Sequence, residues 1–138
     1  MSGKSIRGSC LCGDVTFKLA PPFVFFQYCH CSRCRKTTGS DHAANLMVTM
    51  RQFQWTTGLD YVRRYELPEA KYFCHGFCRQ CGSSLPWVTR SGKHVVVPAG
   101  AIDEGLYAAP EWNVYWGSRP GWARCVSDLP TADEARKS

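Results

Sequence analysis

The stretch Cys78-Arg79-Gln80-Cys81-Gly82 decides the fold of this 138-residue chain, because it supplies half of a metal site. Its C-x2-C spacing is common in structural zinc sites, and Gly82 lets backbone amides turn toward the thiolates. The other half is Cys10-Leu11-Cys12, whose C-x-C spacing lies outside the usual range. A zinc ion held by both halves would close a long loop and stabilise the folded chain. We therefore predict a structural zinc at Cys10, Cys12, Cys78 and Cys81.

A third cluster, Cys29-His30-Cys31-Ser32-Arg33-Cys34, brings three more cysteines close together. They can reach one metal ion from a single loop and leave its fourth coordination position open. Zinc with an open position can take a substrate thiol, which then loses its proton, or can polarise a carbonyl. We predict a catalytic and labile zinc at Cys29, Cys31 and Cys34.

Other interpretations of the cysteines stay open at this point. The two outer pairs compete with buried free thiols, which are common in protein cores. The middle cluster competes with redox use of Cys31 and Cys34 next to basic residues, and with an iron–sulfur cluster completed by Cys74. It also competes with a second structural site, completed by His30, His42, His75 or Cys74. The unclustered Cys74 and Cys125 are interpreted as small core residues.

Composition and the start of the chain indicate the compartment. The chain has nine cysteines, an odd number, and residues 1–8 contain no apolar stretch of the kind found in a secretory signal peptide. Many cysteines without such a signal indicate metal binding in a reducing compartment, so we predict a cytoplasmic protein without disulfides. No apolar run approaches the roughly 20 residues that span a bilayer, so we expect no membrane partner.

The formal net charge of +6 overstates the charge of the metal-bound protein. Seven thiolates on two Zn²⁺ ions remove about three units, so the metallated protein would carry about +3. This argues against nucleic acid as a partner. The densest basic run is Arg33, Arg35 and Lys36, beside the middle cluster. We predict that Arg35 and Lys36 bind a carboxylate of a small anionic ligand.

Strand patterns recur between turn signals along the chain, whereas no long segment has helical periodicity. Residues 14–20 alternate, with Val15, Phe17 and Leu19 on one face, and residues 95–97 are β-branched and expected to be buried. Segment 52–58 is ambiguous between a helical turn and a loop. The remaining predicted strands are 23–28, 43–50, a hairpin of 61–67 with 71–77, and a hairpin of 85–89 with 94–99. We expect one mostly β domain over residues 1–138, with its core at about 6–129 and a polar tail at 130–138.

The expected positions of several further side chains follow from where their residue types usually lie in folded proteins. Trp87, Trp112, Trp116 and Trp122 are expected mostly in the core, and any one of them can wall a ligand pocket. The pair Asp103-Glu104 is expected in an exposed turn. His30 lies between two predicted ligands, so we expect its side chain to point away from the metal, as a supporting or surface group.

The three motifs together resemble the glutathione-dependent formaldehyde-activating enzyme family, which shares its domain with the centromere protein V group. The matching stretches are Gly8-Ser-Cys-Leu-Cys-Gly-Asp-Val-Thr-Phe17, Cys29-His-Cys-Ser-Arg-Cys-Arg-Lys-Thr-Thr-Gly-Ser40 and Phe77-Cys-Arg-Gln-Cys-Gly-Ser-Ser-Leu85. The segment Gly100-Ala-Ile-Asp103 also looks like the G-x-L-D segment of this family. The resemblance runs over residues 6–129.

This resemblance implies a compact, zinc-bound, Mss4-like β-sheet fold. It also implies that Cys10, Cys12, Cys78 and Cys81 hold the structural zinc and that Cys29, Cys31 and Cys34 hold the catalytic zinc. The implied activity is that of a carbon–sulfur lyase, which condenses glutathione with formaldehyde to S-hydroxymethylglutathione. Glutathione would then be a co-substrate, and a thiol and an aldehyde would be the small-molecule partners.

The alternatives are a zinc-stabilised glutathione-binding or thiol-binding protein without turnover, and a structural or nucleic-acid interaction module. A redox enzyme of the methionine sulfoxide type is a further possibility, with Cys74 or Cys125 as the redox thiol. A domain alone does not define a function. The organic part of the pocket is expected in loops 39–44 and 110–121, and the pattern predicts no oligomeric state.

Overall fold

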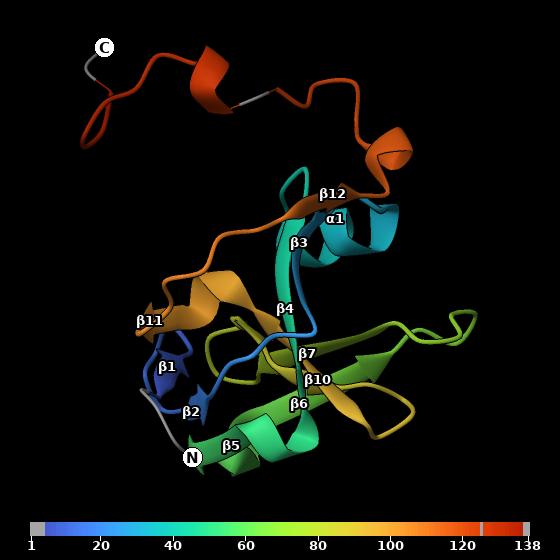
Figure 1. The fold of residues 1–138 in the computed structure, drawn as a ribbon, viewed down its shortest axis with the longest axis vertical. Helices are drawn as coiled ribbons and strands as arrows, with labels where there is room; N and C mark the ends of the chain where they lie inside the picture. The colour runs from blue at the N-terminus through green and yellow to red at the C-terminus, as the bar shows by residue number, and fades with distance from the viewer. Residues whose placement is uncertain (1–4, 125, 137–138) are drawn as a thin grey trace.

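The computed structural model describes residues 5–124 and 126–136, so the unclustered Cys125 lies outside the described residues. Twelve strands form three sheets there, and the one α-helix among these residues is α1 (Ser32–Thr38) (Figure 1). The predicted mostly β fold is confirmed. No helix in the described part of the chain has the length and apolar character to cross a membrane.

The first sheet has the order β11-β1-β2-β5 and is antiparallel throughout. Val15, Phe17 and Leu19 are buried on one face, as their alternation predicts. Segment 52–58, which the sequence leaves ambiguous, is mainly strand, because the ring of Phe53 stacks on Phe17 and Trp55 meets both rings edge-on. The strands are β1 (Ile6–Ser9), β2 (Thr16–Leu19), β5 (Phe53–Thr57) and β11 (Ile102–Glu104).

The second sheet has the order β12-β3-β4-β10-β9, in which only the β12–β3 pair is parallel. Residues 95–97 of β10 are buried as predicted, because β10 lies between two strands and packs into the core. The strands are β3 (Phe25–Cys29), β4 (Ala43–Thr49), β9 (Trp87–Val88), β10 (His94–Pro98) and β12 (Trp112–Val114).

The third sheet, β6-β7-β8, contains β6 (Val62–Glu66), β7 (Cys74–Cys78) and β8 (Ser84–Leu85). Both predicted hairpins are confirmed, as β6 with β7 and as β9 with β10. The predicted strand 85–89 divides at Pro86, so that β8 joins the third sheet and β9 joins the second. Proline has no backbone N–H to continue a ladder, so the chain changes sheets there.

Among the described residues, three 3₁₀ turns connect strands, and two more follow β12. The first three are η1 (Met50–Gln52), η2 (Leu59–Tyr61) and η3 (Ala99–Ala101), and the other two are η4 (Trp116–Ser118) and η5 (Val126–Asp128). Residues 130–136 form no helix or strand and are exposed, in line with the predicted polar tail.

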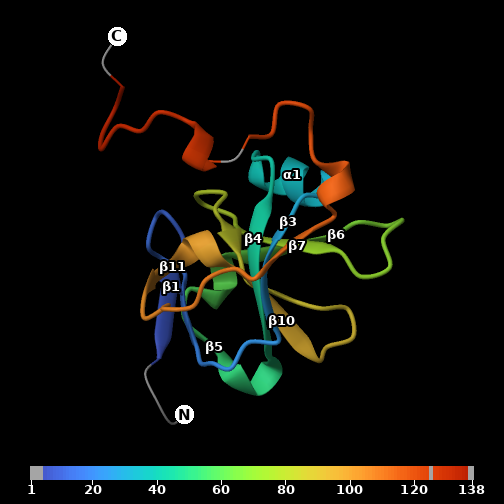
Figure 2. The ribbon, with the colours of Figure 1, turned by 45° about the horizontal axis from the view of Figure 1, so that its top comes forward.

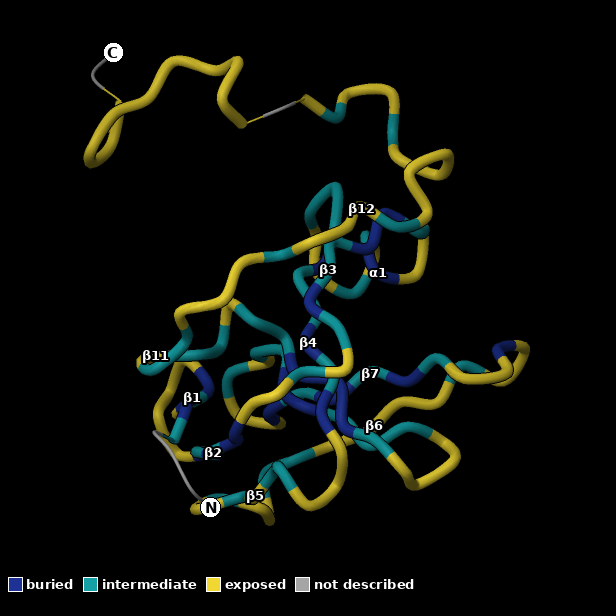
Figure 3. The backbone as a smooth tube through the Cα atoms, in the orientation of Figure 1, coloured by how far each residue is buried: buried dark blue, intermediate teal, exposed yellow. Residues whose placement is uncertain are grey.

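The main core lies between the sheets and reaches the outer cysteine pairs (Figure 3). It includes Phe17, Leu46 and Leu85, and Cys10 and Cys78 belong to the same buried cluster. A metal bound by these cysteines would therefore connect directly to the packing of the core.

The prediction that the tryptophans lie mostly in the core is wrong for three of them. Trp112 is 72% exposed, Trp116 48% and Trp122 65%. Strand β12 and the segment after it cross the surface, and the chain then leaves the body of the domain (Figures 1 and 2). Trp116 still meets the His30 ring edge-on and the Arg119 guanidinium lies over its ring. Asp103-Glu104 is exposed as expected but lies in β11, not in a turn.

Gly58 is a position where only glycine fits, which gives a testable prediction. Its φ is +78°, and a Cβ there would collide with the backbone of Asp14. We expect Gly58→Ala to lower the free energy of unfolding by about 2 kcal/mol or more, because left-handed strain adds to the collision. Gly100→Ala is the matched control, since its Cβ would meet nothing within 4 Å. Equal urea midpoints for the two variants would contradict the prediction.

Candidate functional site

The outer cysteine pairs come together at the ends of two turns. Cys10 and Cys12 lie in the turn between β1 and β2, whereas Cys78 ends β7 and Cys81 lies in the turn before β8. All four sulfurs lie within 4.8 Å of one another. The Sγ–Sγ distance is 3.5 Å for Cys10–Cys12 and 3.9 Å for Cys12–Cys78. Tetrahedral zinc with bonds of about 2.3 Å places its sulfurs about 3.8 Å apart, so this cluster fits zinc.

Backbone amides of the same turns support the thiolates. Val15 N–H lies 3.4 Å from the Cys10 sulfur, and Gly82, at φ +75°, donates its N–H to the Cys78 carbonyl. The Ser83 hydroxyl contacts the Cys81 sulfur at 3.2 Å and lowers the pKa of that thiol to about 5. A lowered pKa favours the thiolate, which is the form that binds metal.

The middle cluster is built by a strand end and a helix start, not by the single loop that the sequence suggests. Cys29 ends β3, Cys31 is the N-cap of α1, and Cys34 lies in the first turn of that helix. The three sulfurs lie within 4.8 Å of one another. Among the described residues no histidine, carboxylate or further cysteine joins this group, which argues against the second structural site and the iron–sulfur cluster.

The thiols of Cys29 and Cys34 are close enough to shift each other's pKa. The Cys34 thiol lowers the pKa of Cys29 to about 6. The same contact, together with burial, raises the pKa of Cys34. The N–H of Cys34 also points at the Cys31 sulfur, at 3.4 Å. Three sulfurs this close together in a partly buried cluster are a suitable donor set for Zn²⁺, and its binding would release the remaining thiol protons.

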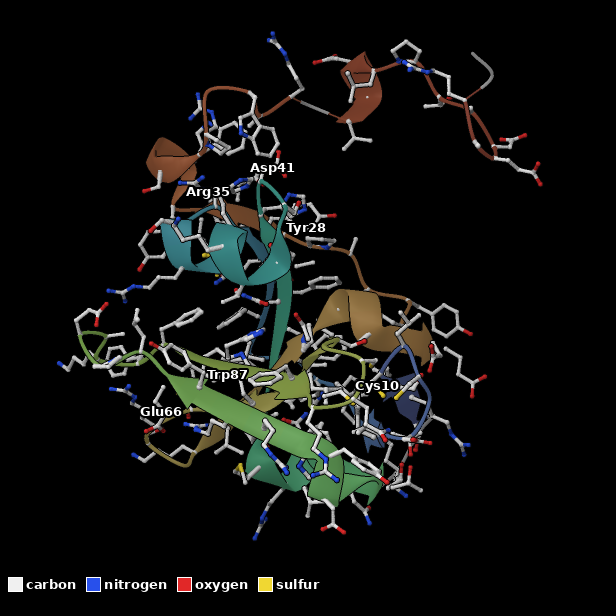
Figure 4. All side chains as sticks on the ribbon, turned by 180° about the vertical axis from the view of Figure 1, so that it is seen from behind. Cys10, Tyr28, Arg35, Asp41, Glu66 and Trp87 are labelled. Carbon is white, nitrogen blue, oxygen red and sulfur yellow. The ribbon has the colours of Figure 1, made fainter. Side chains whose placement is uncertain are left out.

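A pocket of about 630 Å³ extends from Cys34 to Cys10. This volume lies within the usual range for small-molecule sites. In Figure 4 it lies between α1 and the strands that carry Trp87, with Cys10 at one end. Asn45 lines it and points its amide nitrogen toward the Cys34 sulfur, at 4.0 Å. Phe73 and Trp87 add an aromatic wall, with ring centroids 6.0 Å apart.

The two predicted basic residues do not line this pocket. The face of α1 that does so carries Cys34, Thr37 and Thr38, at helical spacing. Arg35 lies on the side of the helix turned away from Trp87, and its Nε is buried without a partner (Figure 4). Lys36 is exposed to solvent. Carboxylate binding by this pair stays a prediction, without support from the pocket.

Of the two loops expected to form the pocket, residues 39–44 contribute and residues 110–121 do not. The structure adds lining residues from strands β1, β9 and β11 and from the turn before β8, chiefly Ser9, Trp87, Asp103 and Ser83. Trp87 was one of the tryptophans predicted as a possible pocket wall, whereas Ser9, Ser83 and Asp103 lie in the quoted motifs but were not predicted to line the pocket. Ser9, Ser83 and Asp103 lie far apart in sequence and meet only when the sheets pack.

The histidines near the site have other partners. His30 is 4% exposed, so it is not a surface group: its Nε2–H donates to Asn113 Oδ1 at 3.1 Å, which ties the Cys29–Cys31 turn to β12. The Nδ1–H of His42 donates to Asp41 at 2.6 Å and holds the pKa of that carboxyl below its ordinary value. His75 lines the pocket, and burial lowers its pKa.

Cys74 is buried in β7, as expected for an unclustered cysteine, and it also lines the pocket. The Arg64 guanidinium lies 2.9 Å from its sulfur. Cys74 lies outside both metal-suited groups, so Cys74→Ser offers a matched control for substitutions in either cluster.

The fold and these two clusters define a class: a small, mostly β protein with cysteine sites suited to metal ions. The family model "Glutathione-dependent formaldehyde-activating enzyme" matches residues 5–118. The chain belongs to this family. A protein of Halomonas elongata named "Putative glutathione-dependent formaldehyde-activating enzyme" is 30% identical over 128 residues, which are 88% of this chain and 82% of that one.

A solved structure supports the fold independently. The crystal structure of a Rhodobacter sphaeroides protein superposes with a TM-score of 0.59 at 22% identity. The match covers 77% of this chain and 98% of that chain. At this identity the likeness concerns the fold alone.

Proposed function

We propose that this protein is a zinc-dependent carbon–sulfur lyase that condenses glutathione with formaldehyde to S-hydroxymethylglutathione. The observation that carries the proposal is the three-cysteine cluster with no fourth ligand among the described residues, placed at a pocket of small-molecule size. Family membership supports the same substrates. We further propose that the chain acts as one domain in the cytoplasm.

Cys29, Cys31 and Cys34 would hold the catalytic zinc, and Cys10, Cys12, Cys78 and Cys81 the structural one. When bound at the three-cysteine cluster, zinc supplies an electrophilic position that keeps a thiol deprotonated. Of the three cysteines, Cys34 lines the pocket, which supports access of a small molecule to the cluster. The four-cysteine cluster offers a complete ligand set, so its role would be to hold the sheets together.

The spontaneous reaction is already fast, so the protein needs to lower the barrier only a little. The glutathione thiol gives its proton to water, its sulfur attacks the aldehyde carbon, the C=O π bond breaks as the C–S bond forms, and the oxygen takes one proton back from water. Asn45 would assist this step, because its amide lines the pocket and its contact with the Cys34 sulfur is long, at 4.0 Å, so the amide keeps donor capacity toward this oxygen. Phe73 and Trp87 would limit the access of bulk water.

The test is exchange-resolved NMR of ¹³C-formaldehyde and glutathione at equilibrium, with and without the zinc-loaded protein. We expect adduct formation to exceed the spontaneous rate in proportion to protein concentration. Glutathione binding without acceleration would instead support a thiol-binding protein without turnover. The spontaneous reaction is fast, so buffer and zinc-only samples serve as the baseline.

A further inference from the structure

The pocket contains an acidic group where the sequence suggested basic ones. Asp103 is the only aspartate or glutamate among the described residues that line it, and no arginine or lysine lines it. A substrate carboxylate would therefore meet no arginine or lysine there among the described residues; the two lining histidines are His42, which is paired with Asp41, and His75, whose pKa is lowered by burial. A substrate ammonium group would meet a carboxylate.

Asp103 is held in place and still has capacity to bind. The Ser9 hydroxyl donates to its Oδ2 at 2.6 Å, and both residues line the pocket. Among the described residues, no hydrogen bond occupies Oδ1 and no salt bridge reaches this carboxylate. The neighbouring Glu104 differs, since it lies 4.0 Å from Arg7 and does not line the pocket.

Ser9 also fixes where the carboxylate lies relative to the two clusters. It ends β1 and directly precedes Cys10, whereas Asp103 lies on β11, which pairs with β1. Ser9 and Asp103 therefore line the pocket beside Cys10, and Cys34 lines the same pocket. A thiol substrate bound at the three-cysteine cluster would share this pocket with the Asp103 carboxylate.

We propose that Asp103, oriented by Ser9, binds the ammonium group of the thiol substrate, so that the pocket selects thiols carrying a free amine. The inference rests on the proposed function and deepens it. An ammonium group has three donors and matches a carboxylate with an unoccupied oxygen. Glutathione carries one such amine, and its carboxylates would stay toward solvent.

The first experiment measures binding, not turnover. Titration calorimetry compares glutathione with N-acetylglutathione, which lacks the ammonium group, on the zinc-loaded wild type and on Asp103→Asn. We expect Asp103→Asn to weaken glutathione about fivefold, as for a partly exposed ion pair, and to leave N-acetylglutathione unchanged. Asparagine can still accept from Ser9, so the local fold is kept. Glu104→Gln is the matched control and should bind both ligands like the wild type.

Two further comparisons make the inference independent of glutathione. γ-Glutamylcysteine, which keeps the thiol-to-amine spacing of glutathione, should bind more tightly than its N-acetyl derivative, and Asp103→Asn should remove that preference. Glutathione diethyl ester should bind within about twofold of glutathione, because no arginine or lysine among the described residues lines the pocket.

If Asp103→Asn weakened the binding of a ligand with a free amine and of its amine-free counterpart equally, the effect of the substitution would be structural and the inference would be overturned. The absence of amine preference in the wild type would also overturn it, even if glutathione fails to bind. Normal amine preference without any acceleration in the NMR experiment would overturn the lyase proposal alone.

Discussion

Replacing Cys78 by serine is expected to leave the protein unfolded at 25 °C. Cys78 is fully buried at the end of β7, in the same core cluster as Phe17 and Leu85, and its sulfur faces the four-cysteine group. Structural zinc contributes on the order of 10–16 kcal/mol of apparent binding free energy in small zinc domains. This is as large as the net stability of a typical domain, about 5–15 kcal/mol, so loss of one ligand should remove the fold. Circular dichroism and zinc content would be measured together.

Cys74→Ser is the matched control for this experiment. Cys74 lies on the same strand as Cys78 and is equally buried, but it belongs to neither cluster. Its substitution should cost only about 1–3 kcal/mol, the penalty for a buried hydroxyl, and should leave the zinc content unchanged. If Cys78→Ser behaved like Cys74→Ser and still retained all its zinc, the structural role of the four-cysteine cluster would be wrong.

The Cys31→Ser variant is expected to fold like the wild type and to lose the acceleration of adduct formation. Cys31 is the N-cap of α1, and serine is among the best residues at an N-cap, so the free energy of unfolding should change by about 1 kcal/mol or less. The acceleration of adduct formation should fall by about 100-fold or more, because even groups that only support metal ligands contribute 10–100-fold. The variant should retain one zinc per chain and lose the second.

The ¹³C-formaldehyde exchange experiment and a urea titration would be run on the same Cys31→Ser sample. Cys74→Ser again serves as control, since Cys74 lines the same pocket and should keep the acceleration. Melting of Cys31→Ser as severe as that of Cys78→Ser would refute the division into a structural and a catalytic metal. Unchanged acceleration would remove the three-cysteine cluster from the reaction.

Much of the fold follows from local patterns in the sequence. The alternation around Phe17, the β-branched run at 95–97 and the two hairpins have the expected places. The short helix α1 was not predicted, because seven residues carry too little periodicity to be seen. Strand β5 was left ambiguous, because its conformation depends on rings of another strand.

The exposed tryptophans show that the usual burial of a residue type does not predict where it lies in a particular fold. Trp112 and Trp122 are as apolar as core residues, yet both are exposed in a segment at the surface of the domain. Burial depends on whether a second layer is present, and composition does not report that.

The sequence by itself determined the three-cysteine cluster and each of the two outer pairs, because ligands two or three residues apart stay close in any compact conformation. The tertiary structure brings the outer pairs together, since Cys12 and Cys78 are 66 residues apart in the chain. The sequence also determined the mostly β character, through alternation and turn residues. Only the tertiary structure decided the pocket. Arg35 is next to Cys34 in the chain, but the helix turns it away, whereas Asp103 is distant and β-sheet pairing with β1 brings it to the pocket. The charge that a substrate meets thus depends on which way side chains face, and nearness in sequence does not determine this.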